Sequence, residues 1–305
     1  MNDAAQPRHI SGNACIKLCY FLEQCRKSQS QSLKNLAYSR ETCQDLFDFY
    51  VEWNEKNQHR SMRQVLELLA SLITANPSKE ISAVFKKDAL ARLVAIVRHQ
   101  SAQPLVKPAF KVLDYFLTKG TVSVSELFIA YGKSYGQETV GVVSTSYSAE
   151  AAVAGKNWGL FVQDVFEWMT LPDTASSAGK LLVSLFGAIK KASANNPVAG
   201  ENQAAYWQQL IQEGLAKYPD SLDNVKNYLF LDLFKVDKSG SLEFLRSLSQ
   251  GNLSELESDE QSDSQAALLL SAMEVGKKVG LVDDAGELSQ NLHAFQTANA
   301  SRYCT

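Results

Sequence analysis

The stretch Arg60–Gly120, RSMRQVLELLASLITANPSKEISAVFKKDALARLVAIVRHQSAQPLVKPAFKVLDYFLTKG, sets a pattern that recurs along the whole chain. It reads as three amphipathic helical segments, in which apolar residues recur at intervals of three and four. Asn76–Pro77 and Gln103–Pro104 separate the segments, because proline disfavours helical geometry in the residue before it. Gly120 stands where helices commonly end on a left-handed residue, so we expect it to close the third segment.

Two start signals and two apolar stripes give this pattern its detail. Ser61 is followed three residues later by Gln64, and Ser123 by Glu126, and both pairs have the form of a capping box. We therefore expect helices to begin at Ser61 and at Ser123. The residues expected in the core of the first and third segments are Met62, Val65, Leu66, Leu69, Leu72, Ile73, Val106, Phe110, Leu113, Phe116 and Leu117.

The same alternation of helix and short break continues on both sides of a small, polar, glycine-spaced segment. Residues 252–264, NLSELESDEQSDS, are acidic and poor in apolar side chains, which predicts an exposed loop. The predicted organisation is a flexible terminus at 1–12, N-terminal helical repeats at 13–131, a loop or seam at 132–156, C-terminal helical repeats at 157–296 and a tail at 297–305.

Helix spacing carries the only resemblance to a known class. Helices are expected to begin near residues 61, 80, 104 and 123, and again near 157, 178, 202, 221, 241 and 265. A pair of helices thus recurs every ~40 to 47 residues, the range of HEAT and armadillo repeats. From Arg40 to Gly280 the chain resembles this class of α-solenoid. The resemblance implies an all-α fold, a right-handed superhelical stack of helical hairpins, and a surface that binds macromolecules.

Composition limits the class of protein. Hydrophobic residues are 45% and charged residues 21% of the chain, which allows a substantial core and argues against wholesale disorder. A net charge of -3 and a pI near 5.9 do not indicate a nucleic-acid-binding composition for the chain as a whole. The first residues do not read as a secretory signal, and no apolar run approaches the ~18 residues of a membrane span. We predict an intracellular protein of the cytoplasm or nucleus, without a membrane partner.

Cysteine is a common metal ligand, so the spacing of the cysteines tests for a metal site. The five cysteines are Cys15, Cys19, Cys25, Cys43 and Cys304. Three of them lie near His9 in sequence, but a structural zinc site typically uses two pairs of ligands, each two to four residues apart. Cys15 and Cys19 instead share one helical face with Leu18 and Leu22. The pattern favours buried free thiols in a reducing compartment, and we predict no metal site.

Other motifs give little support for chemistry. Residues 235–246, KVDKSGSLEFLR, resemble an EF-hand calcium loop at Asp237 and Gly240. The first and twelfth positions are Lys235 and Arg246, whose positive charges would repel Ca²⁺, so we expect a loop followed by a helix start. P-loop and dinucleotide-binding glycine motifs do not occur, and neither an enzyme nor a cofactor is predicted. An active site assembled in space from unrecognised residues is a third interpretation.

Basic residues are the most distinctive group of side chains expected on the surface. Between Lys56 and Gly120, eleven Lys and Arg stand against four Asp and Glu, a net charge of +7, whereas Leu253–Gln290 has a net charge of -7. If the helices stack, several cations would converge on a strip that binds phosphates or acidic peptides. A solvated outer face is the simpler interpretation. The candidate binding residues, called the basic stripe below, are Arg60, Arg63, Lys86, Lys87, Arg92, Arg98, Lys107, Lys111 and Lys119.

These observations predict a non-enzymatic intracellular scaffold or adaptor. Its helical surface would hold another protein within a larger complex. The alternative is an RNA- or ribonucleoprotein-associated helical-repeat protein, for example in ribosome assembly, whose basic stripe touches phosphate. The sequence specifies neither the identity of the partner nor the oligomeric state.

Overall fold

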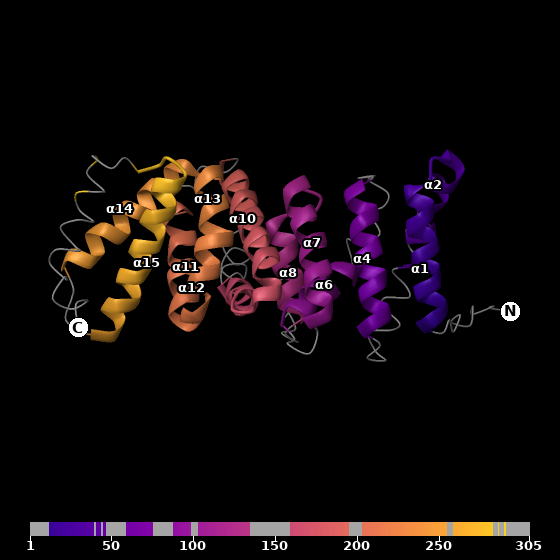
Figure 1. Ribbon diagram of the computed structural model, residues 1–305, viewed down its shortest axis with the longest axis horizontal. Coiled ribbons are helices and arrows are strands. Elements are labelled where there is room, and N and C mark those ends of the chain that lie inside the picture. The colour runs from indigo at the N-terminus through magenta and orange to yellow at the C-terminus, as the bar shows by residue number, and fades with distance from the viewer. Residues whose placement is uncertain are drawn as a thin grey trace, which may run out of the picture. The chain divides into compact units, whose positions relative to one another are not determined.

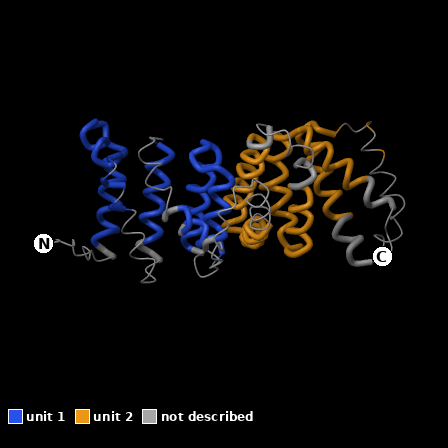
Figure 2. The backbone as a smooth tube through the Cα atoms, turned by 180° about the vertical axis from the view of Figure 1, so that it is seen from behind, with its two compact units in different colours: residues 1–143 blue, residues 144–305 orange. Residues whose placement is uncertain are grey.

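The computed structural model describes residues 12–39, 41–43, 45–46, 59–75, 88–98, 103–134, 159–194, 203–254, 259–282, 286 and 290. Across these residues all regular secondary structure is helical, so the predicted all-α class is confirmed for them. None of the helices described in these ranges is long and apolar enough to cross a membrane. The chain forms two compact units, Met1–Val143 and Ser144–Thr305 (Figure 2), and their boundary falls inside the segment predicted as a loop or seam.

From His59 to Ser134, the described helices of unit 1 alternate between two packed rows, as their contacts show; the helices are labelled in Figure 1. The labelled helices of unit 1 are α1 (Gly12–Lys27), α2 (Gln31–Ala37), α4 (His59–Ala75), α6 (Asp88–Arg98), α7 (Gln103–Lys119) and α8 (Val124–Ser134). In one row α4 packs between α1 and α7, and in the other α6 packs against α8. Contacts between α6 and α7 join the rows, and α2 folds back onto α1. Each helix therefore buries its apolar stripe against its neighbours.

The core of unit 1 agrees with the sequence. Every predicted core residue of α4 and α7 is at most 4% exposed. Tyr131 of α8 and Cys43 are also fully buried, although they come from other segments. At about 25 cal/mol for each Å² of apolar surface buried, this shared seam is the main stabilising term for the row. Exposed positions between the buried ones, such as Arg63 and Lys111, complete the amphipathic pattern.

At the junction between α7 and α8, the end of the first helix and the start of the second follow local sequence signals. Gly120 has a φ of 65°, and the Thr121 N–H donates to the Phe116 carbonyl at 3.1 Å, which is the Schellman ending. The next helix starts with the predicted capping box, because the Ser123 N–H donates to Glu126 Oε2 at 2.7 Å and the Glu126 N–H donates to Ser123 Oγ at 3.2 Å. The other predicted start is wrong, since α4 begins at His59 and Ser61 lies inside the helix.

Unit 2 repeats the two-row arrangement with different helices. Residues 159–169 are helical, and the labelled elements are α10 (Pro172–Ala194), α11 (Gln203–Lys217), η3 (Pro219–Ser221), α12 (Leu222–Asn224), η4 (Val225–Phe230), α13 (Leu231–Val236), α14 (Lys238–Ser254) and α15 (Asp259–Lys278). The α12, η4 and α13 elements form one continuous helix with a π-helical middle. This helix packs between α10 and α15, while α11 packs against α14.

Close approaches at small residues hold unit 2 together. A Cβ at Gly179 of α10 would lie 2.8 Å from the Tyr228 carbonyl oxygen of η4, so only glycine lets these two helices approach so closely. Gly214 of α11 makes room in the same way for the ring of Phe166, 2.7 Å from the position a Cβ would occupy. Nearby, the rings of Trp207 and Phe244 pack with centroids 5.2 Å apart. These contacts fix the positions of neighbouring helices.

Some boundaries differ from the prediction. The predicted acidic loop, residues 252–264, is helical where it is described: residues 252–254 end α14 and residues 259–264 begin α15. Acidic side chains in a first helical turn are stabilised by the positive end of the helix dipole, so Asp259 and Glu260 suit this start. The α10 helix begins at Pro172, which is favoured in a first turn, rather than near residue 178. The predicted seam is helical up to Ser134, and its residues 135–156 lie outside the described ranges. Gly12, the last residue of the predicted terminus, begins α1, whereas residues 1–11 and the predicted tail at 297–305 lie outside the described ranges.

Candidate functional site

The structure describes only part of the predicted basic stripe. Lys107 and Lys111 are exposed one turn apart on α7. Arg63 of α4 is engaged by Glu67, with Nε to Oε1 at 2.8 Å. Arg98 ends α6 and Lys119 ends α7. Lys86 and Lys87 lie outside the described residues, as do the side chains of Arg60 and Arg92.

The segment that resembles a calcium loop has a structural role. Asp237 follows α13 and caps α14, since its Oδ1 accepts the Gly240 N–H at 3.2 Å. The same oxygen is 2.6 Å from Lys190 Nζ of α10, which ties two helices together. The carboxylate therefore already accepts bonds within the chain. This matches the expectation of a loop followed by a helix start.

The segment Gly132–Gly136, GKSYG, has the form G-x-S-x-G. In hydrolases this motif places a serine on a sharp turn between a strand and a helix. Here Gly132 and Ser134 are the last residues of α8, and Tyr135 and Gly136 lie outside the described residues. The serine therefore lies in the last turn of a helix and does not follow a strand, so the motif does not have its required context.

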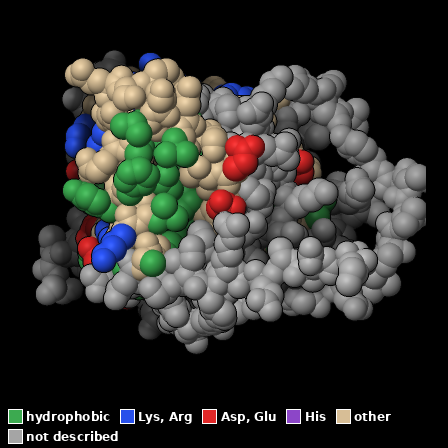
Figure 3. All heavy atoms as spheres, turned by 90° about the vertical axis from the view of Figure 1, so that its right-hand side faces the viewer, with side chains coloured by type: hydrophobic (Ala, Val, Ile, Leu, Met, Phe, Trp, Pro, Cys, Tyr) green, Lys and Arg blue, Asp and Glu red, His purple; other side chains and the backbone are tan. Residues whose placement is uncertain are grey.

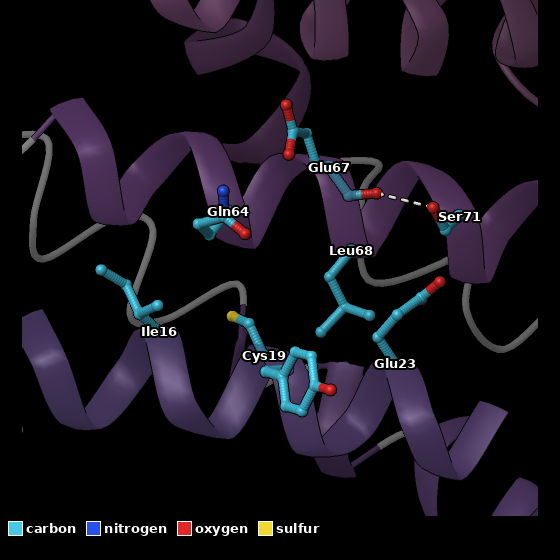
Figure 4. A pocket seen from close by; sticks show the side chains of 8 residues that line it. Ile16, Cys19, Glu23, Gln64, Glu67, Leu68 and Ser71 are labelled. Atoms are coloured by element: carbon cyan, nitrogen blue, oxygen red, sulfur yellow. Dashed lines mark hydrogen bonds between the residues drawn. The ribbon is translucent and has the colours of Figure 1, made fainter. Parts of the chain in front are cut away.

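An open groove between α1 and α4 is a candidate site among the described residues (Figure 4). Its volume is about 280 Å³. The lining residues recur every three or four positions on each helix, because one face of α1 meets one face of α4. They are Ile16, Cys19, Tyr20 and Glu23 from α1, and Gln64, Glu67, Leu68 and Ser71 from α4.

The groove has an apolar floor and a polar rim. Ile16 and Cys19 point from α1 toward α4, and Leu68 points from α4 toward α1 (Figure 4). Tyr20 is 68% exposed, so most of its ring is open to solvent. The Ser71 hydroxyl donates to the Glu67 carbonyl at 2.9 Å within α4. Figure 4 shows the Glu67 carboxylate turned away from α1, toward the side where Arg63 holds it.

Glu23 is the acid that faces the groove. Its carboxylate accepts from Arg26 at 2.6 Å and 2.9 Å and lies 3.1 Å from Lys27 Nζ. The bond from Arg26 holds the pKa of Glu23 below its ordinary value, so this group stays ionised at neutral pH. Because Arg26 and Lys27 balance its charge, the groove is nearly neutral. Apolar and aromatic contact is then the main source of binding that it offers.

Hydrophobic side chains also gather on the face formed by α1 and α2 (Figure 3). Phe21 on α1 is 49% exposed, and Leu33 and Leu36 on α2 are 40% and 46% exposed. Phe21 directly follows Tyr20 in the chain but does not line the groove. Two consecutive exposed aromatic residues of α1 therefore lie on different surfaces.

The predicted buried thiols are confirmed for four of the five cysteines, whereas Cys304 lies outside the described residues. Cys15, Cys19, Cys25 and Cys43 are at most 3% exposed, and all four are free. In the described ranges no three His, Cys, Asp or Glu side chains gather as a possible metal site. His9, which was considered beside these cysteines, lies outside those ranges.

The comparisons with known proteins assign no family. No family model matches the chain, and no significant match was found among curated proteins or solved structures.

Proposed function

We propose that this chain is a non-enzymatic scaffold or adaptor of the armadillo/HEAT-like kind, which binds another protein within a larger complex in the cytoplasm or nucleus. The alternation of helices between two rows, present in each unit, supports a repeat architecture. The helix spacing of the sequence supports the finer assignment, a right-handed superhelical stack. Stacked helical hairpins serve mainly as extended binding surfaces.

The groove between α1 and α4 carries the proposal. It is a preformed concavity between neighbouring helices of one row, and it is open to solvent. Tyr20 lies on it with two thirds of its surface exposed. A large aromatic ring beside a hollow is the usual composition of a binding hot spot, because the ring loses much surface to a partner at little entropic cost.

The lining indicates the chemistry of the partner. Ile16 and Leu68 offer an apolar floor, so the partner inserts an apolar or aromatic side chain. Gln64 and Ser71 on the rim can bond to the backbone of the segment that carries it. The occupant is therefore a protein segment with one apolar anchor, and not a polyanion, since none of the residues that line the groove is Lys or Arg.

The test starts with affinity purification of the tagged chain and identification of co-purifying proteins. A purified partner is then titrated against wild type, Tyr20→Ala and Phe21→Ala. We expect Tyr20→Ala to weaken the Kd at least tenfold, as loss of an aromatic hot spot does, while Phe21→Ala changes it less than threefold. If both substitutions change the Kd equally, the groove is not the binding site. Failure to recover any stoichiometric partner would contradict the proposed scaffold role.

RNA binding is the alternative outcome of the same design. It would depend on basic side chains and fall steeply with salt. Lys107→Glu/Lys111→Glu reverses two exposed cations of α7 without touching the groove. Loss of generic RNA binding in this variant, with Tyr20→Ala unaffected, would favour the alternative. We expect the opposite pattern.

A further inference from the structure

Two cysteines on α1 form a pair that the proposed binding role does not use. Cys15 and Cys19 are four residues apart, so they lie one turn apart on the same helical face. Their Sγ atoms are 4.0 Å apart. Both side chains are buried, at 0% and 3% exposed. The helix thus holds two thiols at a fixed, short separation in an apolar seam.

One member of the pair can be reached from solvent. Cys19 lines the groove between α1 and α4, and Figure 4 shows its sulfur in the space between the two helices. A reagent that enters the groove meets Cys19, whose sulfur lies 4.0 Å from that of Cys15. The volume of about 280 Å³ leaves room for a substituent that projects back into the groove.

Because both thiols are buried, a net charge on the pair is energetically disfavoured. The bond between the two sulfurs, together with burial, raises the pKa of Cys19, so this thiol keeps its proton at neutral pH. A ligand that left a net charge between the sulfurs would be penalised in this apolar seam. The suitable ligand is one that replaces both thiol protons and leaves a neutral product.

We propose that Cys15 and Cys19 form a two-thiol site for trivalent arsenic, which enters through the groove between α1 and α4. The reaction is a condensation without change of oxidation state. R–As(OH)₂ and two thiols give R–As(S-Cys)₂ and two waters: two As–O and two S–H bonds break, while two As–S and two O–H bonds form. The product is neutral, and its R group occupies the groove.

The sulfur separation suits a bridging atom better than a disulfide. A disulfide would require the sulfurs to close from 4.0 Å to about 2.05 Å. An atom bonded to both at about 2.3 Å, the length of a zinc–sulfur bond, spans 4.0 Å at an angle of about 120°. Small rotations of the two side chains then reach the narrower angle of a pyramidal arsenic centre, and the helix need not unwind.

The binding test uses phenylarsine oxide and the full-length, reduced protein, followed by intact mass spectrometry. We expect one tightly held adduct that survives excess monothiol, is removed by a dithiol, and is prevented by excess arsenite. Cys15→Ala and Cys19→Ala should each weaken binding at least tenfold. Cys25→Ala and Cys43→Ala serve as matched buried-thiol controls and should retain the adduct. Circular dichroism checks that each variant is folded.

Several results would overturn the site. These are no adduct on the folded wild type, an adduct retained by folded Cys19→Ala, or an adduct lost equally in Cys25→Ala or Cys43→Ala. If Cys15→Ala or Cys19→Ala fails to fold, Cys15→Ser and Cys19→Ser replace them with the same expectations. If these also fail, peptide mapping of the wild-type adduct decides, because the arsenic must bridge the two α1 positions.

The route is tested separately by the rate of the reaction. Gln64→Trp places a large ring on the groove wall, and Lys111→Trp places the same ring on an exposed position of α7 as a control. We expect the first variant to slow adduct formation at least fivefold with unchanged stoichiometry, and the second to react like wild type. Equal rates in all three proteins would overturn entry through the groove.

Discussion

Unit 2 joins its helices by close, specific contacts, whereas unit 1 joins α1 to α4 beside an open groove. In unit 2, Lys190 bonds Asp237 at 2.6 Å, and the Asn224 side-chain amide donates to the Met169 carbonyl at 2.7 Å across 55 positions of sequence. In unit 1, the bonds of Glu23 and Glu67 to their cations stay within one helix. Both units have buried apolar stripes, so burial alone does not distinguish them.

The difference indicates that the packing of unit 2 is more rigidly specified, whereas unit 1 offers a surface suited to binding. Polar bonds between distant residues and glycine contacts fix one packing geometry, because few other arrangements satisfy them. A seam of leucine, valine and cysteine is more permissive, since apolar side chains of suitable volume repack at modest cost. Unit 1 combines this permissive seam with the groove and Tyr20, as a surface for a partner requires. The predictions below test this comparison from the largest expected effect to the smallest.

The largest effect is expected at Gly179, where α10 packs directly against the backbone of Tyr228 in η4. Gly179→Ala places a Cβ 2.8 Å from the Tyr228 carbonyl oxygen and 2.9 Å from its carbon, where backbone and not a flexible side chain must move. We expect unfolding free energy to fall by about 1–3 kcal/mol, the range for overpacked sites. Denaturant unfolding followed by circular dichroism measures the loss, and hydrogen exchange shows whether it falls in unit 2.

Gly187→Ala on the same helix is the matched control. A Cβ there has nothing within 4 Å. Alanine in a helix interior is favoured over glycine by about 0.5–1 kcal/mol, so this variant should be slightly stabilised. If both variants change stability alike, the contact between α10 and η4 is looser than described and the contrast between the units weakens.

The second prediction concerns the buried thiols of unit 1. Burial raises the pKa of Cys43 to about 11 from 9.0. Between these values the unfolded thiol loses its proton while the folded one keeps it, so stability is fully present below pH 9 and falls as pH rises toward 11. The loss is on the order of 2 kcal/mol for this one group. Unfolding curves from pH 8 to 11.5 should fall less steeply for Cys43→Ala than for wild type. Parallel profiles would contradict the effect of burial.

Helix content and the cores of α4 and α7 could be predicted because they depend on short-range patterns. The apolar residues from Met62 to Ile73 recur at steps of three and four, which is the period of a helix. The buried face of α4 can therefore be recognised without knowing which helices pack against it. Boundaries were less predictable. Residues 252–264 contain few apolar side chains, yet neighbouring helices extend into them, because helix length depends on contacts beyond the local sequence.

The candidate site was not predictable in the same way. It needs Ile16 and Cys19 to face Gln64 and Leu68 across nearly fifty residues of chain, and no local pattern encodes which helices pair. The one available signal was Tyr20, a large ring outside the buried stripe of α1. The basic stripe drew attention because charge is visible in a sequence, whereas a groove is not.

The third prediction returns to the junction between α7 and α8 in unit 1. Ser123→Ala removes the hydroxyl that accepts the Glu126 N–H at 3.2 Å, and it leaves a donor of the first turn without its partner. We expect a loss of about 1 kcal/mol, typical of a helix cap. Ser125→Ala, an exposed serine in the same turn, should stay within 0.5 kcal/mol of wild type, as surface changes usually do. Similar losses in both would show that the capping box is not what stabilises this junction.

The smallest effect is expected at the ion pair on the outer side of α4. The Arg63 and Glu67 side chains are 51% and 41% exposed, so solvent screens their attraction. A double-mutant cycle with Arg63→Gln and Glu67→Gln should give a coupling of about 0.3–0.5 kcal/mol, the usual value for such a pair one turn apart.

Because stability hardly depends on the pair, the same variants separate folding from binding. A partner that docks in the groove should bind Arg63→Gln nearly as well as wild type, since the Glu67 carboxylate points away from α1 (Figure 4) and Arg63 does not line the groove. A tenfold loss of affinity in that variant, with stability unchanged, would move the binding surface of unit 1 from the groove to the basic stripe.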